Sequence, residues 1–215
     1  MVTKNTKGSF LIALGAVLVI AALSLVFYNC YHEKQSKKAM DNALTNLKNV
    51  IPVDEEEDSS SPFDVFDDNF NDDNTLKEEE SADDDTVELD GNIYMGIISF
   101  PTLGQEFPVI KGWSYADMNV APCRYAGTRS DRDLIICAHN YSGFFDKLDR
   151  LNSGDEVVFT DIHGREFIYV VSYSELINGW NSDAMFAGAK EDWSLTLFTC
   201  TWSGYSRVTV RCVEK

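Results

Sequence analysis

The stretch from Leu195 to Val213 reads LTLFTCTWSGYSRVTVRCV, two short runs rich in apolar and β-branched residues around a polar, glycine-containing segment. This pattern predicts two β-strands that flank a loop. Cys200 ends the first strand and Arg207 begins the second. A strand end that passes into a loop can expose a reactive side chain on a rigid support. Cys200 is therefore the first candidate for a catalytic group.

Similar short runs fill the sequence before this stretch, starting near residue 92. They lie at residues 93–100, 106–110, 133–139, 156–160 and 165–172. Turn residues separate them, and Asp161-Ile162-His163-Gly164 between the last two indicates a hairpin. Residues 144–151 suggest a helical turn. Roughly seven or eight short strands with little helix predict a mainly β fold, a barrel or a sandwich, over about 125 residues.

His139 is the candidate partner for Cys200, because it ends the apolar run DLIICAH as Cys200 ends LTLFTC. His32 lies beside an apolar N-terminal segment, and His163 lies in the hairpin turn. A Cys–His pair with a nearby arginine supports thiol acyl transfer: the imidazole moves protons, and Arg207 pairs with the thiolate or orients a carbonyl oxygen. Taken singly, each of these side chains could equally be structural.

The chain has five cysteines. Cys30 lies at the edge of the apolar segment, and Cys123 follows a proline in an expected loop. We expect Cys123, Cys137 and Cys212 to be reduced and structural, as free cysteines in strands usually are. A disulfide between Cys123 and Cys137 is the alternative.

Residues 10–28, FLIALGAVLVIAALSLVFY, form an uncharged run of 19 residues. That length is close to the roughly 20 residues that span a bilayer as a helix. We expect an uncleaved transmembrane anchor here, after a short tail of residues 1–9. A signal peptide is the alternative, but its apolar region usually has about 7–15 residues and a small-residue cleavage site, which is absent here. Basic residues are nearly balanced across the run, so charge leaves its orientation open.

Residues 29–53 are expected to form a membrane-proximal helical stalk. Met40, Leu44, Leu47 and Ile51 recur at helical spacing, and Pro52 ends the pattern. The stripe is too short to indicate a coiled coil.

The formal net charge of −17 is concentrated in residues 54–90, which contain 18 acidic residues and the single base Lys77. This acidity argues against nucleic acid as a partner. A self-repelling segment of this kind predicts a disordered linker. Its apolar residues Phe63, Val65, Phe66 and Phe70 are read as scattered, with a docking element as the alternative. At about 3.3 Å per residue the linker would extend to roughly 120 Å, which suggests a spacer between anchor and catalytic domain.

Three ordered motifs resemble the active-site signature of the sortases: His139 in AHN, Cys200 in LTLFTC and Arg207 in RVTVRC. The run GIISFPTLGQEFPVI (Gly96–Ile110) is similar to the opening strand pair of that family. The resemblance covers about residues 92–215. It implies a closed β-barrel of about eight strands with short helices over 91–215, preceded by the transmembrane helix and the acidic linker.

The resemblance also implies a reaction. Cys200 would attack the scissile carbonyl of an LPxTG-like sorting signal and form a thioester, His139 would transfer protons, and Arg207 would bind the substrate backbone or the oxyanion. Thr199 would help to shape the oxyanion site. The thioester would pass to an amine acceptor, a peptidoglycan cross-bridge or a pilin lysine, and the substrates would be surface proteins or pilins with a C-terminal sorting signal.

The implied location is a single-pass membrane protein with a cytoplasmic N-terminus and an extracellular catalytic domain. No cofactor or metal is expected, because the acidic runs lack the spacing of an EF-hand. The compact stretch 177–193, too short for a long helical insertion, and the lack of a second apolar span leave a class B- or D-like subclass open. Two other functions also stay open: a cysteine endopeptidase that hydrolyses its acyl-enzyme, and a catalytically silent tethered binding module.

Overall fold

The computed structural model describes residues 6–52 and 85–215. Most of the expected acidic linker, including Phe63, Val65, Phe66 and Phe70, lies outside the described residues. The helical elements are α1 (Thr6–Val50), η1 (Pro101–Leu103), α2 (Tyr115–Met118), η2 (Phe145–Arg150) and α3 (Ser182–Phe186). The strands are β1 (Val87–Leu89), β2 (Asn92–Phe100), β3 (Gln105–Ile110), β4 (Cys123–Ala126), β5 (Leu134–Cys137), β6 (Glu156–Asp161), β7 (Glu166–Asn178), β8 (Leu195–Cys200) and β9 (Ser206–Glu214).

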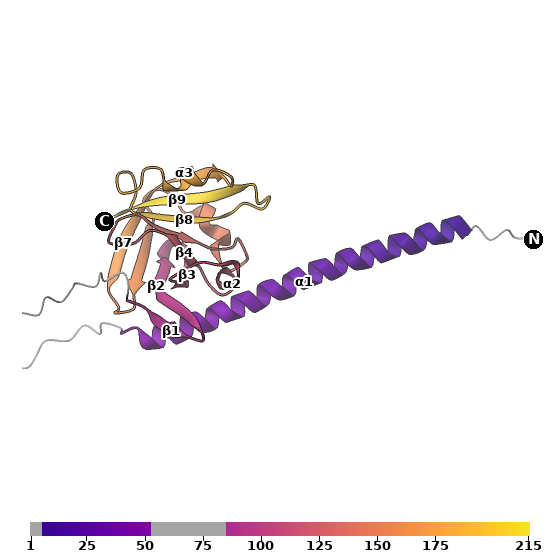
Figure 1. The fold of residues 1–215 in the computed structure, drawn as a ribbon, viewed down its shortest axis with the longest axis horizontal. Helices are drawn as coiled ribbons and strands as arrows, with labels where there is room; N and C mark the ends of the chain where they lie inside the picture. Colours follow the sequence, from indigo (N-terminus) through magenta and orange to yellow (C-terminus); the bar gives the residue numbers. More distant parts are fainter. Residues whose placement is uncertain (1–5, 53–84) are drawn as a thin grey trace, which may run out of the picture.

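Eight strands close into a barrel in the order β2-β3-β4-β5-β8-β9-β7-β6, and β6 pairs back onto β2. The β3–β4 and β5–β8 pairs are parallel, and the other pairs are antiparallel. The expected mainly β fold, a closed barrel of about eight strands with short helices, is confirmed (Figure 1). Closure leaves no free sheet edge among these eight strands.

The barrel core follows from the alternation of side chains along its strands. In β6, Val157 and Phe159 point inward and are buried, whereas their neighbours are partly exposed. Phe100, Phe107 and Phe145 pack against one another with ring centroids 5.4–5.6 Å apart. β5 is buried at all four positions, because other buried clusters cover its outer face. A strand covered on both faces is a rigid support for the residue that follows it.

Two short strands depart from the sequence-based expectation. Cys123 lies in β4 rather than in a loop, opposite Cys137 of β5. β1 pairs with β2 through a hairpin whose turn, Asp90-Gly91, has positive φ at both residues. Asp-Gly is a favoured pair for such a two-residue turn. The folded domain therefore begins before the expected boundary at residue 91.

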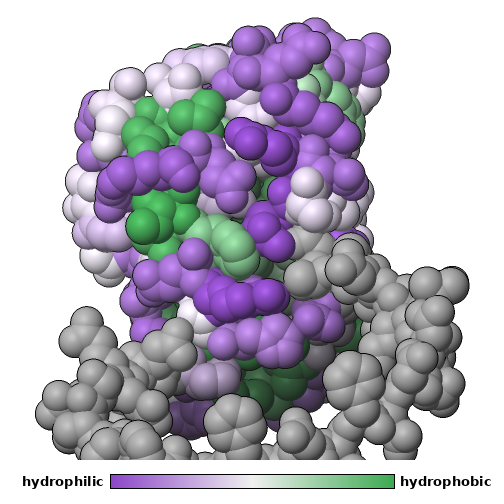
Figure 2. Space-filling model, turned by 90° about the vertical axis from the view of Figure 1, so that its left-hand side faces the viewer, coloured by the Kyte–Doolittle hydropathy of each residue, from purple (hydrophilic) through white to green (hydrophobic). Residues whose placement is uncertain are grey.

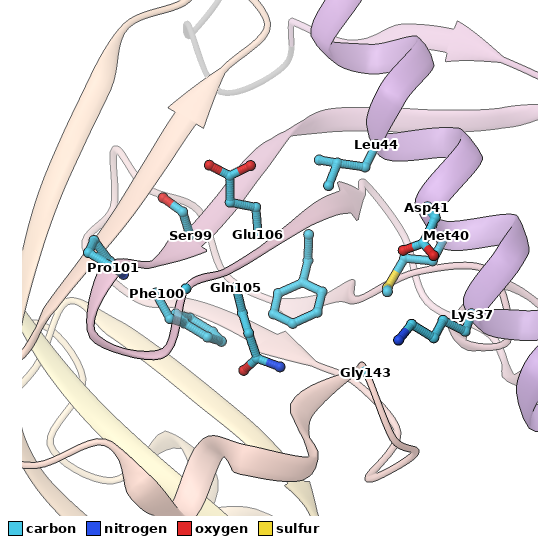
Figure 3. Close-up of a pocket in the computed structure, with 12 residues that line it drawn as sticks. Lys37, Met40, Asp41, Leu44, Ser99, Phe100, Pro101, Gln105, Glu106 and Gly143 are labelled. Carbon is cyan, nitrogen blue, oxygen red and sulfur yellow. The ribbon is translucent and has the colours of Figure 1, made fainter.

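α1 is one continuous helix in which the expected anchor and stalk differ in their surroundings. Its apolar N-terminal part is not buried, and it is long and apolar enough to cross a membrane. The expected helical stalk is docked on the barrel, where Met40, Ala43, Leu47 and Ile51 are buried. Figure 3 shows Met40 and Leu44 directed from α1 toward the β2–β3 hairpin, across a groove of about 570 Å³.

The two residues that border the undescribed segment 53–84 lie at the same place on the barrel. The carbonyl oxygen of Pro52 is 2.4 Å from the position that a Cβ on Gly164 would occupy. Asp85 pairs with His163, 2.8 Å from Oδ2 to Nε2. Because α1 itself docks on the barrel, the segment is not the connection that sets the distance between anchor and domain. This arrangement is contrary to the expected role of the acidic segment as a spacer between the anchor and the barrel.

The end of the barrel turned away from the apolar half of α1 has a mainly hydrophilic surface. Apolar residues gather there only in small areas bordered by hydrophilic ones (Figure 2). Small separate apolar areas are normal on a soluble protein surface. The site described next lies elsewhere on the molecule, where β5 and β8 end.

Candidate active site

The register of β8 with its two neighbours brings the three predicted site residues to one edge of the barrel. In the parallel β5–β8 pair, Cys137 lies opposite Phe198. Two residues beyond this pair come His139 and Cys200, so both are placed at the edge of the barrel where β5 and β8 end. On the other side of Cys200, the antiparallel β8–β9 pair places Arg207 directly opposite.

A groove of about 200 Å³ opens beside Cys200. Aromatic and apolar side chains form most of its lining, and residues at the end of β7 and just after it also contribute. The lining residues are Trp113, Tyr115, Met118, Tyr125, Cys137, Ala138, Ile177, Asn178, Gly179, Asn181, Ser182, Met185, Phe198, Cys200 and Arg207. A mainly apolar cleft with a few polar groups at one point suits the binding of a peptide segment with apolar side chains.

Arg207 is held by the loop between β8 and β9. Its Nη1 donates to the carbonyl oxygens of Gly204, at 2.9 Å, and Ser206, at 3.2 Å. A Cβ on Gly179 would lie 2.9 Å from the same Nη1, so the absence of a side chain there leaves room for the guanidinium. The fixed planar cation beside Cys200 can bind a carbonyl oxygen or a developing oxyanion.

His139 is half-buried and stacks on Tyr141, with ring centroids 4.4 Å apart and planes 17° apart. Burial lowers the pKa of His139, and the nearby His32 of α1 lowers it further. Both causes favour the neutral imidazole, which is the form that can take a proton from a thiol.

Thr199 is buried, and its Oγ1 donates to the carbonyl oxygen of Ala138 at 2.9 Å. Successive residues of a strand point to opposite faces, so this side chain points away from that of Cys200. The geometry does not support the expected role of the Thr199 side chain in an oxyanion site. Its hydroxyl instead ties β8 to the residue that precedes His139.

All five cysteines are free thiols in this structure. Burial raises the pKa of Cys137 to about 12, with a further contribution from Cys200 nearby, and burial also raises the pKa of Cys123 and Cys212. A thiol with a raised pKa forms little thiolate, the reactive species. Cys137 and Cys200 both line the groove, and of the two only Cys200 is partly exposed, at the end of its strand.

Sequence reasoning missed a buried arginine next to the groove. Arg211 is fully buried, and it donates to Glu175, to Thr196 and to the carbonyl oxygens of Ala184 and Met185 in α3. It therefore fixes α3, which forms part of the groove wall. Its place four residues after Arg207 in an alternating strand was the available signal, since both point to one face.

Within residues 6–52 and 85–215, no group of three or more His, Cys, Asp or Glu side chains is arranged to hold a metal ion.

Comparison with known proteins agrees with this architecture. A model of the sortase domain matches residues 98–215. No curated protein matches the chain. The fold is similar to sortase A from Corynebacterium diphtheriae, with 19% identity and a TM-score of 0.50, over 58% of this chain and 61% of that one. It is also similar to the pilus-related sortase C of Group B Streptococcus, with 24% identity and a TM-score of 0.50, over 57% and 67% of the two chains.

A third structure of the same fold is Clostridium perfringens sortase C with the C-terminal cell wall sorting motif. It is 20% identical with a TM-score of 0.50, over 57% of this chain and 70% of that one. The chain thus spans about three fifths of the first of these relatives, and slightly more of the other two. At these identities the likeness shows a common fold.

Proposed function

The chain belongs to the sortase family, and we propose that it is a membrane-anchored cysteine transpeptidase that cleaves an LPxTG-like sorting signal and passes the acyl group to an amine. The proposal is supported by the strand register, which pairs Cys200 with Arg207 and lets His139 follow the end of the neighbouring strand β5, and by the groove with a mainly apolar lining beside Cys200. Neutral imidazole, thiol and fixed cation are the groups that thiol acyl transfer needs.

In the first half of the reaction, the imidazole of His139 takes the proton of the Cys200 thiol, and the thiolate attacks the scissile carbonyl carbon. The carbonyl oxygen becomes an oxyanion, and the guanidinium of Arg207 stabilises it. The tetrahedral intermediate collapses, the peptide C–N bond breaks, and the imidazolium of His139 gives its proton to the leaving amine. The product is a thioester on Cys200.

In the second half, an incoming amine attacks the thioester carbonyl and His139 takes its proton. Collapse of the second intermediate breaks the C–S bond and releases Cys200 as a thiolate, which regains a proton from His139. One amide bond is broken and one formed, so no oxidant or cofactor is needed. If water took the place of the amine, the same site would act as an endopeptidase.

The substrates proposed are surface proteins or pilins with a C-terminal sorting signal, and the acceptor is a peptidoglycan cross-bridge or a pilin lysine. The structure of Clostridium perfringens sortase C with the C-terminal cell wall sorting motif, which has the same fold, supports this substrate class. We place the N-terminus in the cytoplasm, the apolar half of α1 in the membrane and the barrel outside, with α1 as the anchor.

The test uses the full chain in lipid vesicles with a library of peptides that carry LPxTG-like motifs, with and without triglycine. Wild type should cleave a subset and yield a ligated product when triglycine is present. Cys200→Ala should abolish both, with kcat/KM reduced by about 10³-fold or more. Cleavage that persists in Cys200→Ala would refute the proposal. Cleavage without ligation, either to triglycine or to an added lysine-bearing pilin peptide, would show an endopeptidase. No cleavage of any motif by wild type would favour a binding module.

A further inference from the structure

α1 contacts the loop that directly follows His139. The Oε1 of Glu33 accepts a hydrogen bond from the backbone N–H of Ser142 at 2.6 Å. One helical turn further, the side chain of Lys37 lies 3.0 Å from the position that a Cβ on Gly143 would occupy. Gly143 also has a φ of +85°, which a residue with a side chain rarely adopts. The loop is therefore shaped to fit against the helix.

The same loop also contacts His139. Tyr141, the residue before Ser142, is stacked on the imidazole, and its carbonyl oxygen accepts from the N–H of Phe144 at 2.9 Å. The carbonyl oxygen of His139 accepts from the N–H of Phe145 at 3.2 Å. Phe144 and Phe145 are buried in the same cluster as Met40 of α1. The segment after His139 is thus fixed at its far end by the core and at its middle by Glu33.

The helix leaves the substrate groove open. A cleft of about 540 Å³ lies beside this contact, and residues of α1, of the loop after His139 and Trp202 line it. Among the described residues, the groove beside Cys200 has no lining residue from α1. α1 therefore supports the His139 side of the site and does not cover the Cys200 side.

We propose that Glu33 is a positioning residue for His139. Its carboxylate holds the N–H of Ser142, which fixes the Tyr141 ring against the imidazole and so sets the imidazole beside Cys200. The juxtamembrane helix is then part of the catalytic unit as well as an anchor. This inference rests on the proposed function, because it assigns His139 the proton transfers.

The position of Glu33 along α1 also fixes the height of the site above the membrane. Tyr28 ends the apolar run, and Glu33 lies five residues later, which is a rise of about 8 Å along a helix. A site held by Glu33 therefore works next to the bilayer surface rather than up to 120 Å away. Figure 1 agrees, since the β8–β9 loop extends on the side toward which the apolar half of α1 runs.

The experiment compares Glu33→Ala, Glu33→Gln and Lys34→Ala in the full chain in lipid vesicles. Glu33→Ala removes the acceptor, and a misplaced imidazole should lower kcat by about 10–100-fold. KM should stay unchanged, because the groove has no lining residue from α1. Glu33→Gln keeps a side-chain oxygen that can accept the same hydrogen bond and should retain most of kcat. Lys34 is exposed on the same helical turn and is the matched control, with no change expected.

A second readout needs no sorting substrate and separates this inference from the proposed function. The rate of Cys200 alkylation by iodoacetamide at fixed pH depends on how the imidazole faces the thiol. Glu33→Ala should slow it, and Glu33→Gln should not. Unchanged alkylation and kcat in Glu33→Ala, or equal losses in all three variants, would overturn the positioning role. If wild type cleaves no peptide while alkylation still responds to Glu33→Ala alone, the proposed function fails and the positioning role stands.

Discussion

Cys200 and Thr199 are neighbours on β8, and their side chains have different surroundings because successive side chains of a strand point to opposite faces. Cys200 faces the groove, whereas Thr199 faces the interior and bonds to the carbonyl oxygen of Ala138. That one hydrogen bond joins β8, the strand of the proposed nucleophile, to the residue before His139. At this scale the site depends on buried polar bonds, each of which leaves an unpaired partner when it is removed.

Thr199→Val tests this bond, since valine keeps the shape of threonine and lacks the hydroxyl. The carbonyl oxygen of Ala138 would lose a buried partner, at a cost of about 1–3 kcal/mol in the free energy of unfolding. The kcat should also fall, because β5 and β8 lose a link next to the two residues that we propose to be catalytic. Urea unfolding and steady-state kinetics measure the two effects, and Thr199→Ser, which keeps the hydroxyl, is the control. A kcat equal to wild type in Thr199→Val would show that the bond does not position His139.

His32 predicts a shift in the pH profile of the enzyme. The groups shown next to His139 are His32 of α1 and Tyr141 of its own loop. Glu33 and Asp146 line a cleft together with His32 and Tyr141, and Cys200 and Arg207 lie at the edge of the barrel where β5 ends. The value of kcat/KM should rise with pH as His139 loses its proton. His32→Gln removes a neighbouring positive charge, so the pKa of His139 increases and this rise moves to higher pH. The pKa of His139 should still stay below the ordinary value for histidine, because burial contributes more to its lowering than His32 does.

The control for the pH profile is His32→Lys, which makes the neighbouring positive charge permanent. Its acid limb should move to lower pH, opposite to that of His32→Gln. Shifts of the same sign in both variants, measured as kcat/KM between about pH 5 and 9, would contradict an electrostatic effect of His32.

At the scale of elements, α1 is one continuous helix whose two halves have different surroundings. The apolar stretch is exposed all round, as a membrane span requires, whereas the later stretch buries a single stripe against the β2–β3 hairpin. The periodicity of that stripe is visible in the sequence. Its partner is not, because periodicity indicates that a face is buried and does not indicate what covers it.

Leu47→Ala measures how much of the domain's stability depends on α1. Leu47 is completely buried, and its truncation should lower the free energy of unfolding by about 2–5 kcal/mol. Val50→Ala, three residues along on an exposed position, is the matched control, with a change within about 0.5 kcal/mol expected. Thermal unfolding of both variants decides the matter. Equal melting temperatures would mean that α1 and the barrel are energetically independent.

At the scale of the whole molecule, the docking of α1 on the barrel changes the role that can be assigned to the acidic segment. Pro52 lies against Gly164, and Asp85 pairs with His163, so residues 53–84 leave and rejoin the barrel at one turn. The distance between membrane and active site is then a property of α1. The charge of −17, which resides mostly in and around this segment, says little about the substrate of the barrel.

Excision of residues 53–84, with a flexible join of about six Gly and Ser residues, should leave both activity and melting temperature close to wild type. The join needs to cover only the short path between two residues that contact neighbouring positions of the same turn. Peptide ligation in vesicles and thermal unfolding provide the measurements. A loss of ligation by vesicle-bound enzyme with an unchanged melting temperature would restore the spacer role of the segment.

The sequence by itself determined the chemistry and much of the architecture: the strand pattern, the helical turn near 144–151, the apolar span, and Cys200, His139 and Arg207 as candidate site residues. These features can be predicted because each depends on residues that are close together in the sequence. Only the tertiary structure decided that the Thr199 hydroxyl bonds to Ala138, that Arg211 holds the groove wall, and that Glu33 reaches the loop after His139. Such contacts join residues far apart in sequence, 109 positions in the last case, and no local pattern encodes which surfaces meet.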